Sequence, residues 1–231
     1  RTLSIAKYYL TRNIDSFETY RIDRYMKAKK VGNVKYEAKS IAFKGHYFTN
    51  IGKEKNALDE FKSAYNLIKD TEDKKDIIAL LGNIGNSFSH INIDSTIYYY
   101  NSAGKMAKSI GDLDQYYKVK FNTSRIQSNV SKKEDALKGY IECLAFFEKN
   151  ASSNKKQIAY TLGNIGTIYS DLRDHKTAIN YFKRAIKLNE ELQDKMMMNS
   201  NYLNLAYSYK DISNIAMARN YINKVDTNRI Y

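Results

Sequence analysis

One pentapeptide occurs twice without change, and its spacing constrains the fold more than any other feature of this chain. Leu-Gly-Asn-Ile-Gly occupies residues 81–85 and again residues 162–166, which is 81 residues further on. A weaker copy at residues 121–124 divides that distance into two periods of about 40 residues, and another at residues 203–206 follows one period later. Self-similarity at a fixed period of about 20–50 residues indicates a stacked array of small structural units.

A second pattern follows each copy at helical spacing. A small residue is followed four positions later by an aromatic or apolar residue, and three positions after that by another small or apolar residue. Spacings of four and three place such a triplet on one face of a helix. The triplets are Ala57, Phe61 and Ala64; Thr96, Tyr100 and Ala103; Ala136, Tyr140 and Cys143; Ala178, Phe182 and Ala185; and Ala218, Ile222 and Val225.

Each unit is therefore predicted to be two helices. The first carries the asparagine-containing segment and the second carries the triplet, with small residues that let the two helices approach closely. The chain contains no proline, and helix formers are frequent, so an all-α fold is expected. Gly32 and Gly111 are predicted to end helices, and Asp94 and Asp174 to cap helix starts. We predict a single array over 1–231, with a degenerate first pair at 1–33 and clear pairs at 34–73, 74–112, 113–153, 154–194 and 195–228.

Charge and cysteine content limit the classes of partner and location. The net charge is +13, from 38 Lys and Arg against 25 Asp and Glu, and such a balance can attract nucleic acid, anionic membrane or acidic peptides. The lysines are scattered over predicted turns and helix ends, so we interpret them as solvated and disfavour nucleic acid as a partner of this segment. The single Cys143 excludes an intramolecular disulfide.

The apolar runs and the first residue of the sequence bear on membrane insertion and cellular location. No apolar run approaches the ~18 residues of a transmembrane helix, so no membrane span is predicted in this segment. Because the chain begins at Arg1 rather than Met, we expect it to be a piece of a longer protein, with an appended output domain. A cytoplasmic location is favoured, and a periplasmic one stays open in case a leader was trimmed.

The repeat resembles the tetratricopeptide repeat. The copy most similar to that family is residues 162–169, Leu-Gly-Asn-Ile-Gly-Thr-Ile-Tyr, followed by Ala178, Phe182 and Ala185. It departs from the family in lacking its tryptophan and closing proline, and in a period longer than the family's ~34 residues. Lengthened units of this kind resemble those of bacterial signal-sensing regulators. The resemblance implies a right-handed α-solenoid of five to six antiparallel helix pairs, whose first helices line a concave groove that binds peptides or proteins.

Four asparagines are the main candidate ligand contacts. Each lies two residues before the small residue of a first helix, so its side chain is predicted to point away from the face that packs on the second helix. A carboxamide both accepts and donates, so a row of them could hold an extended peptide backbone with little regard for its side chains. Some proteins of the tetratricopeptide-repeat family that this chain resembles, among them the O-GlcNAc transferases, use a similar row. The four are Asn83, Asn122, Asn164 and Asn204.

Further candidates lie one turn from the asparagines on the same predicted face. Arg125 could pair with an acidic side chain or a terminal carboxylate. The alternative interpretation for all of these residues is an ordinary solvated helix face. The additional candidates are His46, Asn86, Arg125, Thr167 and Tyr207, with Lys118 and Lys210 on neighbouring turns.

Other chemistry is not indicated. The three histidines and the cysteine have no metal-ligand spacing, and no nucleophile–base pair or cofactor motif is recognisable. We therefore predict no metal, no cofactor, no catalytic residues and no enzymatic activity. The predicted function is a peptide- or protein-binding module, the sensor or scaffold part of a regulator. Two alternatives stay open: a basic nucleic-acid-binding helical repeat, and a structural module that self-associates through its apolar end.

Overall fold

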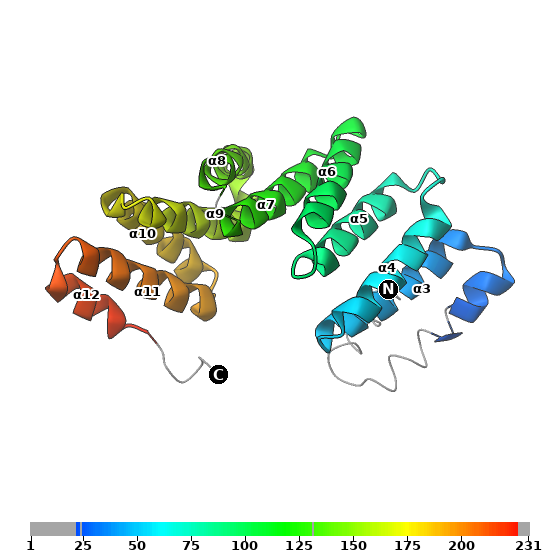
Figure 1. Cartoon of the computed structure of the whole chain (residues 1–231), viewed down its shortest axis with the longest axis horizontal. Helices are drawn as coiled ribbons and strands as arrows, with labels where there is room; N and C mark the ends of the chain where they lie inside the picture. The colour runs from blue at the N-terminus through cyan, green and yellow to red at the C-terminus, as the bar shows by residue number, and fades with distance from the viewer. Residues whose placement is uncertain (1–21, 24, 131, 226–231) are drawn as a thin grey trace. The chain divides into compact units, whose positions relative to one another are not determined.

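The computed structural model describes residues 22–23, 25–130 and 132–225. The described part contains helices and turns but no strand, and Figure 1 shows the helices following one another in antiparallel pairs. Their bounds are α3 Val34–Asn50, α4 Glu54–Ile68, α5 Lys74–Phe88, α6 Ile93–Ser109, α7 Leu113–Asn129, α8 Lys133–Lys149, α9 Ala151–Asp171, α10 His175–Glu191, α11 Lys195–Asp211 and α12 Ile215–Ile222. The predicted all-α repeat of helix pairs is confirmed.

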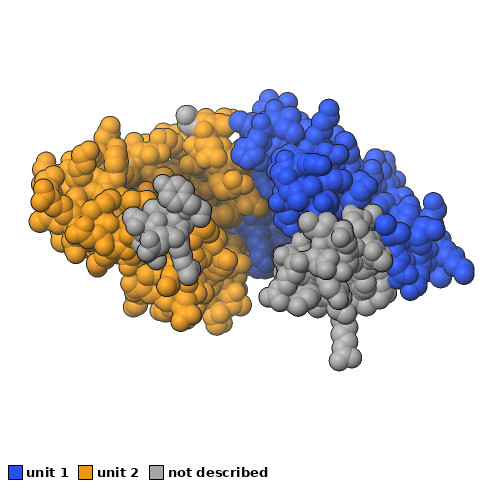
Figure 2. Space-filling view, turned by 90° about the horizontal axis from the view of Figure 1, so that it is seen from below, with its two compact units in different colours: residues 1–119 blue, residues 120–231 orange. Residues whose placement is uncertain are grey.

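The chain divides into two compact units, residues 1–119 and 120–231, which Figure 2 shows in separate colours. The boundary falls inside α7. Within each unit successive helices pack on one another, as α3 does on α4 and α10 does on α9 and α11. The single array over 1–231 stays a prediction. Most of the degenerate first pair lies outside the described residues, and residues 25–30 of it are helical.

Glycine and an aromatic ring form the contact inside three of the pairs. A Cβ added to Gly45 would lie 2.6 Å from the Phe61 ring, one on Gly85 would lie 2.8 Å from Tyr100, and one on Gly166 would lie 2.7 Å from Phe182. Real Cβ atoms do not approach carbon so closely, so only glycine lets the ring lie on the first helix of its own pair. The repeated second glycine of the pentapeptide is thus a packing residue.

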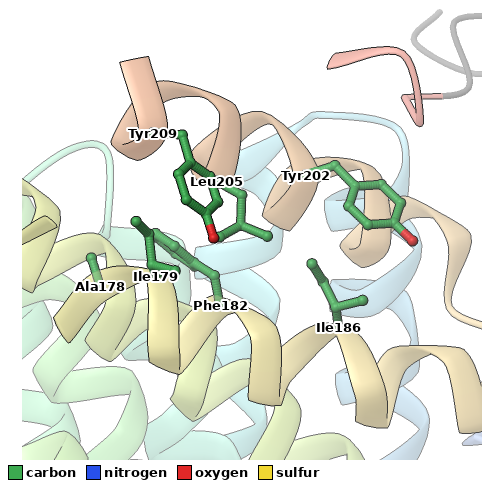
Figure 3. Close-up of a cluster of buried hydrophobic side chains, with 7 residues drawn as sticks. All are labelled: Ala178, Ile179, Phe182, Ile186, Tyr202, Leu205 and Tyr209. Atoms are coloured by element: carbon green, nitrogen blue, oxygen red, sulfur yellow. The ribbon is translucent and has the colours of Figure 1, made fainter. Parts of the chain in front are cut away.

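The predicted triplets form the core of the second helices. In α4, α6, α8 and α10 all three members are almost completely buried, including Tyr100 and Tyr140. α12 differs, because Ile222 at the aromatic position is 47% exposed. Between α10 and α11 the buried side chains point toward one another across the helix interface, as Figure 3 shows: Ala178, Ile179, Phe182, Ile186, Tyr202, Leu205 and Tyr209.

The turn predictions are mostly confirmed. Gly32 and Gly111 adopt φ values of 65° and 71°, the left-handed conformation that glycine takes at little cost. Asp174 caps α10 by accepting a hydrogen bond from the Thr177 amide. The prediction for Asp94 was wrong, because Asn92 caps α6 instead and accepts from the Ser95 amide. Both residue types cap helices well, and the sequence contains both within one turn.

One polar residue occupies an apolar core position. Eleven residues after the first member of each triplet, four pairs hold a fully buried residue: Ile68, Ala107, Phe147 and Asn189. Neither side-chain nitrogen nor oxygen of Asn189 has a hydrogen-bond partner among the described residues. A buried carboxamide without partners costs about 1–3 kcal/mol of stability.

We therefore expect Asn189→Leu to raise the free energy of unfolding by about 1–3 kcal/mol, because the position accepts apolar side chains in the other pairs. Urea unfolding followed by circular dichroism measures the change. Asn180→Leu on the exposed face of the same helix is the control, with little expected change. A loss of stability in Asn189→Leu would show that the carboxamide is satisfied, for example by an internal water.

A membrane span is not found in the described part of the chain, where every helix is too short or too polar to cross a bilayer.

Candidate functional site

A hollow of about 260 Å³ lies between the successive first helices α3 and α5 of the first unit. Its floor consists of the buried side chains of Ala38, Ile68 and Leu80. Ala79 is exposed at its mouth. The remaining lining residues are Lys39, Ala42, Phe43, His46, Asp76 and Asn83.

The sequence explains why this interface is not filled. Residues 38–46 of α3 and 76–83 of α5 run along facing stripes, with spacings of three and four that keep them on one side of each helix. Three of the facing positions are alanines, Ala38, Ala42 and Ala79, whose methyl groups do not reach across the gap between two helix axes.

Two predicted site residues meet at one end of the hollow. Asn83 Nδ2 of α5 lies 3.4 Å from His46 Nε2 of α3. With the imidazole proton on Nδ1, the amide donates this hydrogen bond to the ring. Burial lowers the pKa of His46 below its usual 6.5, so the ring is neutral at neutral pH. Its other contact is an edge-to-face packing on Phe61, with ring centroids 5.0 Å apart.

An ion pair closes the other end. Lys39 Nζ lies 3.1 Å from Asp76 Oδ2, and Lys35 Nζ lies 3.5 Å from the same oxygen. That oxygen is shielded from solvent and receives no bond of hydrogen-bond geometry, so the contact is electrostatic. Lys35 also donates to Asp73, and this hydrogen bond is the main cause of its raised pKa. The charged groups of the hollow are therefore already matched to one another.

The other three asparagines of the row are half-buried on α7, α9 and α11. Asn164 Nδ2 donates to the Tyr160 carbonyl of its own helix at 3.0 Å. The Tyr160 hydroxyl in turn donates to Asp194 Oδ2 at 3.1 Å. Their register along the first helices is as the sequence indicated, whereas their contact with a ligand stays a prediction for Asn122, Asn164 and Asn204.

The neighbouring candidates are divided between internal contacts and open surface. Asn86 accepts a hydrogen bond from the buried Tyr100 hydroxyl, and Thr167 donates to the Gly163 carbonyl at 3.1 Å. Lys118 pairs with Asp114 on its own helix at 2.5 Å. Tyr207 and Lys210 are exposed on α11, and Arg125 is half-buried on α7. The structure brings only His46 and Asn83 of the predicted residues together in one hollow.

A buried network that the sequence did not indicate connects α9, α10 and α11. Ser170 Oγ lies 3.4 Å from His175 Nδ1, and His175 Nε2 lies 3.2 Å from Asp211 Oδ2. Serine, histidine and aspartate follow one another as in a hydrolytic triad, but the two ring nitrogens are exchanged, since a triad places the serine at Nε2 and the aspartate at Nδ1. The Ser170 hydroxyl is buried, however, and faces Ser208 at 3.4 Å rather than a substrate space. We interpret the network as a set of polar contacts that link the three helices. It joins residues up to 41 positions apart, so the sequence alone did not reveal it.

The comparisons with known proteins agree with this description. Residues 159–192, which run from within α9 through its turn to the end of α10, match the family model described as tetratricopeptide repeat. No curated protein sequence matches the chain.

Solved structures with a similar fold extend over most of the chain. BtubC (BKLC) from P. vanneervenii is 18% identical to this chain with a TM-score of 0.79, and the match covers 94% of this chain and 89% of the BtubC chain. The apo form of the quorum sensor NprR from B. thuringiensis is 19% identical with a TM-score of 0.76, covering 96% of this chain and 62% of its own. NprR in complex with its cognate peptide NprX is 20% identical with a TM-score of 0.67, covering 96% of this chain and 64% of its own. At these identities the similarity establishes the fold. This chain therefore has the helical-repeat fold of tetratricopeptide-repeat proteins, and its residues 159–192 match the model of that repeat.

Proposed function

We propose that this chain binds an extended peptide segment along the exposed faces of its first helices and acts as the sensing part of a regulator. The observation that carries the proposal is the placement of Asn83 at the hollow between α3 and α5, in the same helical register as three further asparagines. Amide side chains in that register can accept from and donate to a peptide backbone.

Two further observations support it. The hollow opens between first helices, the helices that carry the asparagine row, rather than between the two helices of a pair. NprR, which shares the fold, is described as a quorum sensor and has been solved with its cognate peptide. Binding of a peptide to several successive helices would favour one spacing of those helices and so influence an attached output domain.

The test uses peptides selected from a phage-displayed random dodecapeptide library against the whole chain. The variant Asn122→Ala/Asn164→Ala removes two backbone contacts, each worth about 0.5–1.5 kcal/mol. We therefore expect the dissociation constant of a selected peptide, measured by calorimetry, to rise about 5- to 150-fold. Circular dichroism spectra and melting curves establish that the variant is folded.

The matched control is Asn180→Ala, an exposed asparagine on the second helix α10. It should leave the affinity unchanged. Equal affinity of the double variant and the wild type would refute the asparagine row, and failure to enrich any peptide would refute peptide binding. Binding of a single-stranded oligonucleotide with a steep salt dependence would instead favour the nucleic-acid alternative.

A further inference from the structure

The hollow between α3 and α5 differs from the asparagine row in what it can recognise. Amides contact the backbone of a peptide, which every sequence shares. The hollow has a defined volume and mostly apolar walls from Ala38, Ala42 and Phe43 on α3 and from Ala79 and Leu80 on α5. A site of this kind distinguishes side chains by their size and polarity.

We propose that the hollow is a selectivity pocket that accepts one uncharged apolar side chain, aliphatic or aromatic, from an extended peptide bound across α3 and α5. The proposal rests on the proposed function, since it assigns the residue type that one position of the bound peptide must carry.

The size of the hollow fits one such side chain. A cavity of about 150 Å³ lined by apolar groups is large enough to hold a benzene molecule. The hollow measures about 260 Å³ and is open at Ala79, so a leucine, isoleucine or phenylalanine side chain can enter without displacing a helix. From Lys39 to His46 is two turns of helix, about 10 Å, which spans one side chain and its flanking backbone.

The charges at the hollow disfavour a charged guest side chain. Lys39 and Asp76 are paired at 3.1 Å, so neither is available to neutralise a charged guest. At the opposite end, Asn83 and His46 form a neutral pair at 3.4 Å. A charged side chain entering between them would lose its hydration without gaining a counter-ion, which is costly in an apolar site. An apolar side chain gains from burial against the same walls.

The Asn83 carboxamide also sets the direction of entry. One of its amide protons is used by His46, while its other proton and its oxygen remain to contact the peptide backbone beside the guest side chain. Backbone contact and side-chain pocket thus lie next to each other at the hollow, an arrangement that suits an extended chain whose side chains alternate in direction.

The experiment takes peptides from the same display selection and compares the wild type with two variants that fill the hollow. Ala42→Leu adds bulk inside the hollow, and Ala79→Leu adds it at the exposed mouth, where folding is least affected. In the wild type we expect one position of the selected peptides to be apolar, and its replacement by alanine to weaken binding about 10- to 100-fold. In each filled variant the original peptide should bind about as weakly as its alanine version binds the wild type. Replacing the apolar residue of the peptide by alanine should then weaken its binding to the filled variant little further.

Ala145→Leu, an exposed alanine of α8 outside the hollow, is the matched control and should bind as the wild type does. Melting curves separate a blocked pocket from a misfolded one, since filling a hollow should leave the melting temperature unchanged or higher. Wild-type affinity in both filled variants overturns the pocket. If the asparagine variant loses binding while the filled variants retain it, the proposed function stands and the pocket falls. If no peptide is enriched, both fail.

Discussion

Phe182→Ala is expected to lower the free energy of unfolding by about 3–5 kcal/mol, the usual cost of truncating a fully buried aromatic side chain. The Phe182 ring is completely buried, lies on Gly166 of α9, and faces Leu205 and Tyr209 of α11 in the cluster of Figure 3. Its removal leaves a cavity where three helices meet, and glycine at position 166 has no side chain to fill it.

Tyr181→Ala is the matched control, because it removes the adjacent ring of the same helix. Tyr181 is half-buried and stacks on Tyr169 with centroids 5.6 Å apart. Such a pair contributes about 0.5–1.5 kcal/mol beyond its buried area, so the loss should be clearly smaller. Urea unfolding gives both values. Because repeat arrays can unfold in parts, amide hydrogen exchange in α9, α10 and α11 should show where stability is lost. Equal losses in the two variants would contradict the assigned role of Phe182.

The two glycines of the first pentapeptide are expected to respond to alanine with opposite signs. Gly85→Ala would place a Cβ 2.8 Å from the Tyr100 ring, and overpacking of this kind costs about 1–3 kcal/mol. Gly82→Ala would place its Cβ in open space, with no other group within 4 Å. Glycine in a helix interior is about 0.5–1 kcal/mol less favourable than alanine, so this variant should be more stable than the wild type.

The two variants control for each other, since they make the same chemical change in one helix three residues apart. Melting temperature and urea midpoint should fall for Gly85→Ala and rise for Gly82→Ala. The second copy provides a third comparison. At Gly163 a Cβ would lie 3.2 Å from Asn201 Oδ1 of α11, so Gly163→Ala should lack the gain expected at Gly82. A shift of the same sign at Gly82 and Gly85 would show that these contacts do not govern stability.

The helix pairs could be predicted because each depends on contacts that recur at fixed sequence spacing. The glycine of a first helix and the aromatic residue of its second helix are 15 or 16 residues apart, as in Gly85 with Tyr100, and this combination returns in three helix pairs. A repeat that is visible in the sequence therefore predicts both the elements and the face on which they pack. α12 departs from this pattern, since Ile222 occupies the aromatic position but remains exposed.

The candidate site could be predicted only in part. The register of Asn83 on its helix is a property of the sequence, and so is the position of His46 beside Gly45. That the two residues meet across α3 and α5 depends on how closely those helices approach, which is set by the combined size of Ala38, Ala42 and Ala79. None of these alanines is distinctive in the sequence, where small residues also mark tight helix contacts.

The sequence by itself determined the period, the all-helical units and the residues that bind each pair together, because these rest on local helical geometry repeated at regular spacing. The tertiary structure decided the hollow, the Ser170, His175 and Asp211 network, and the different surroundings of Gly82 and Gly163. These features form between successive helix pairs. There, small differences in side-chain volume decide whether an identical pentapeptide faces a neighbouring helix or open space.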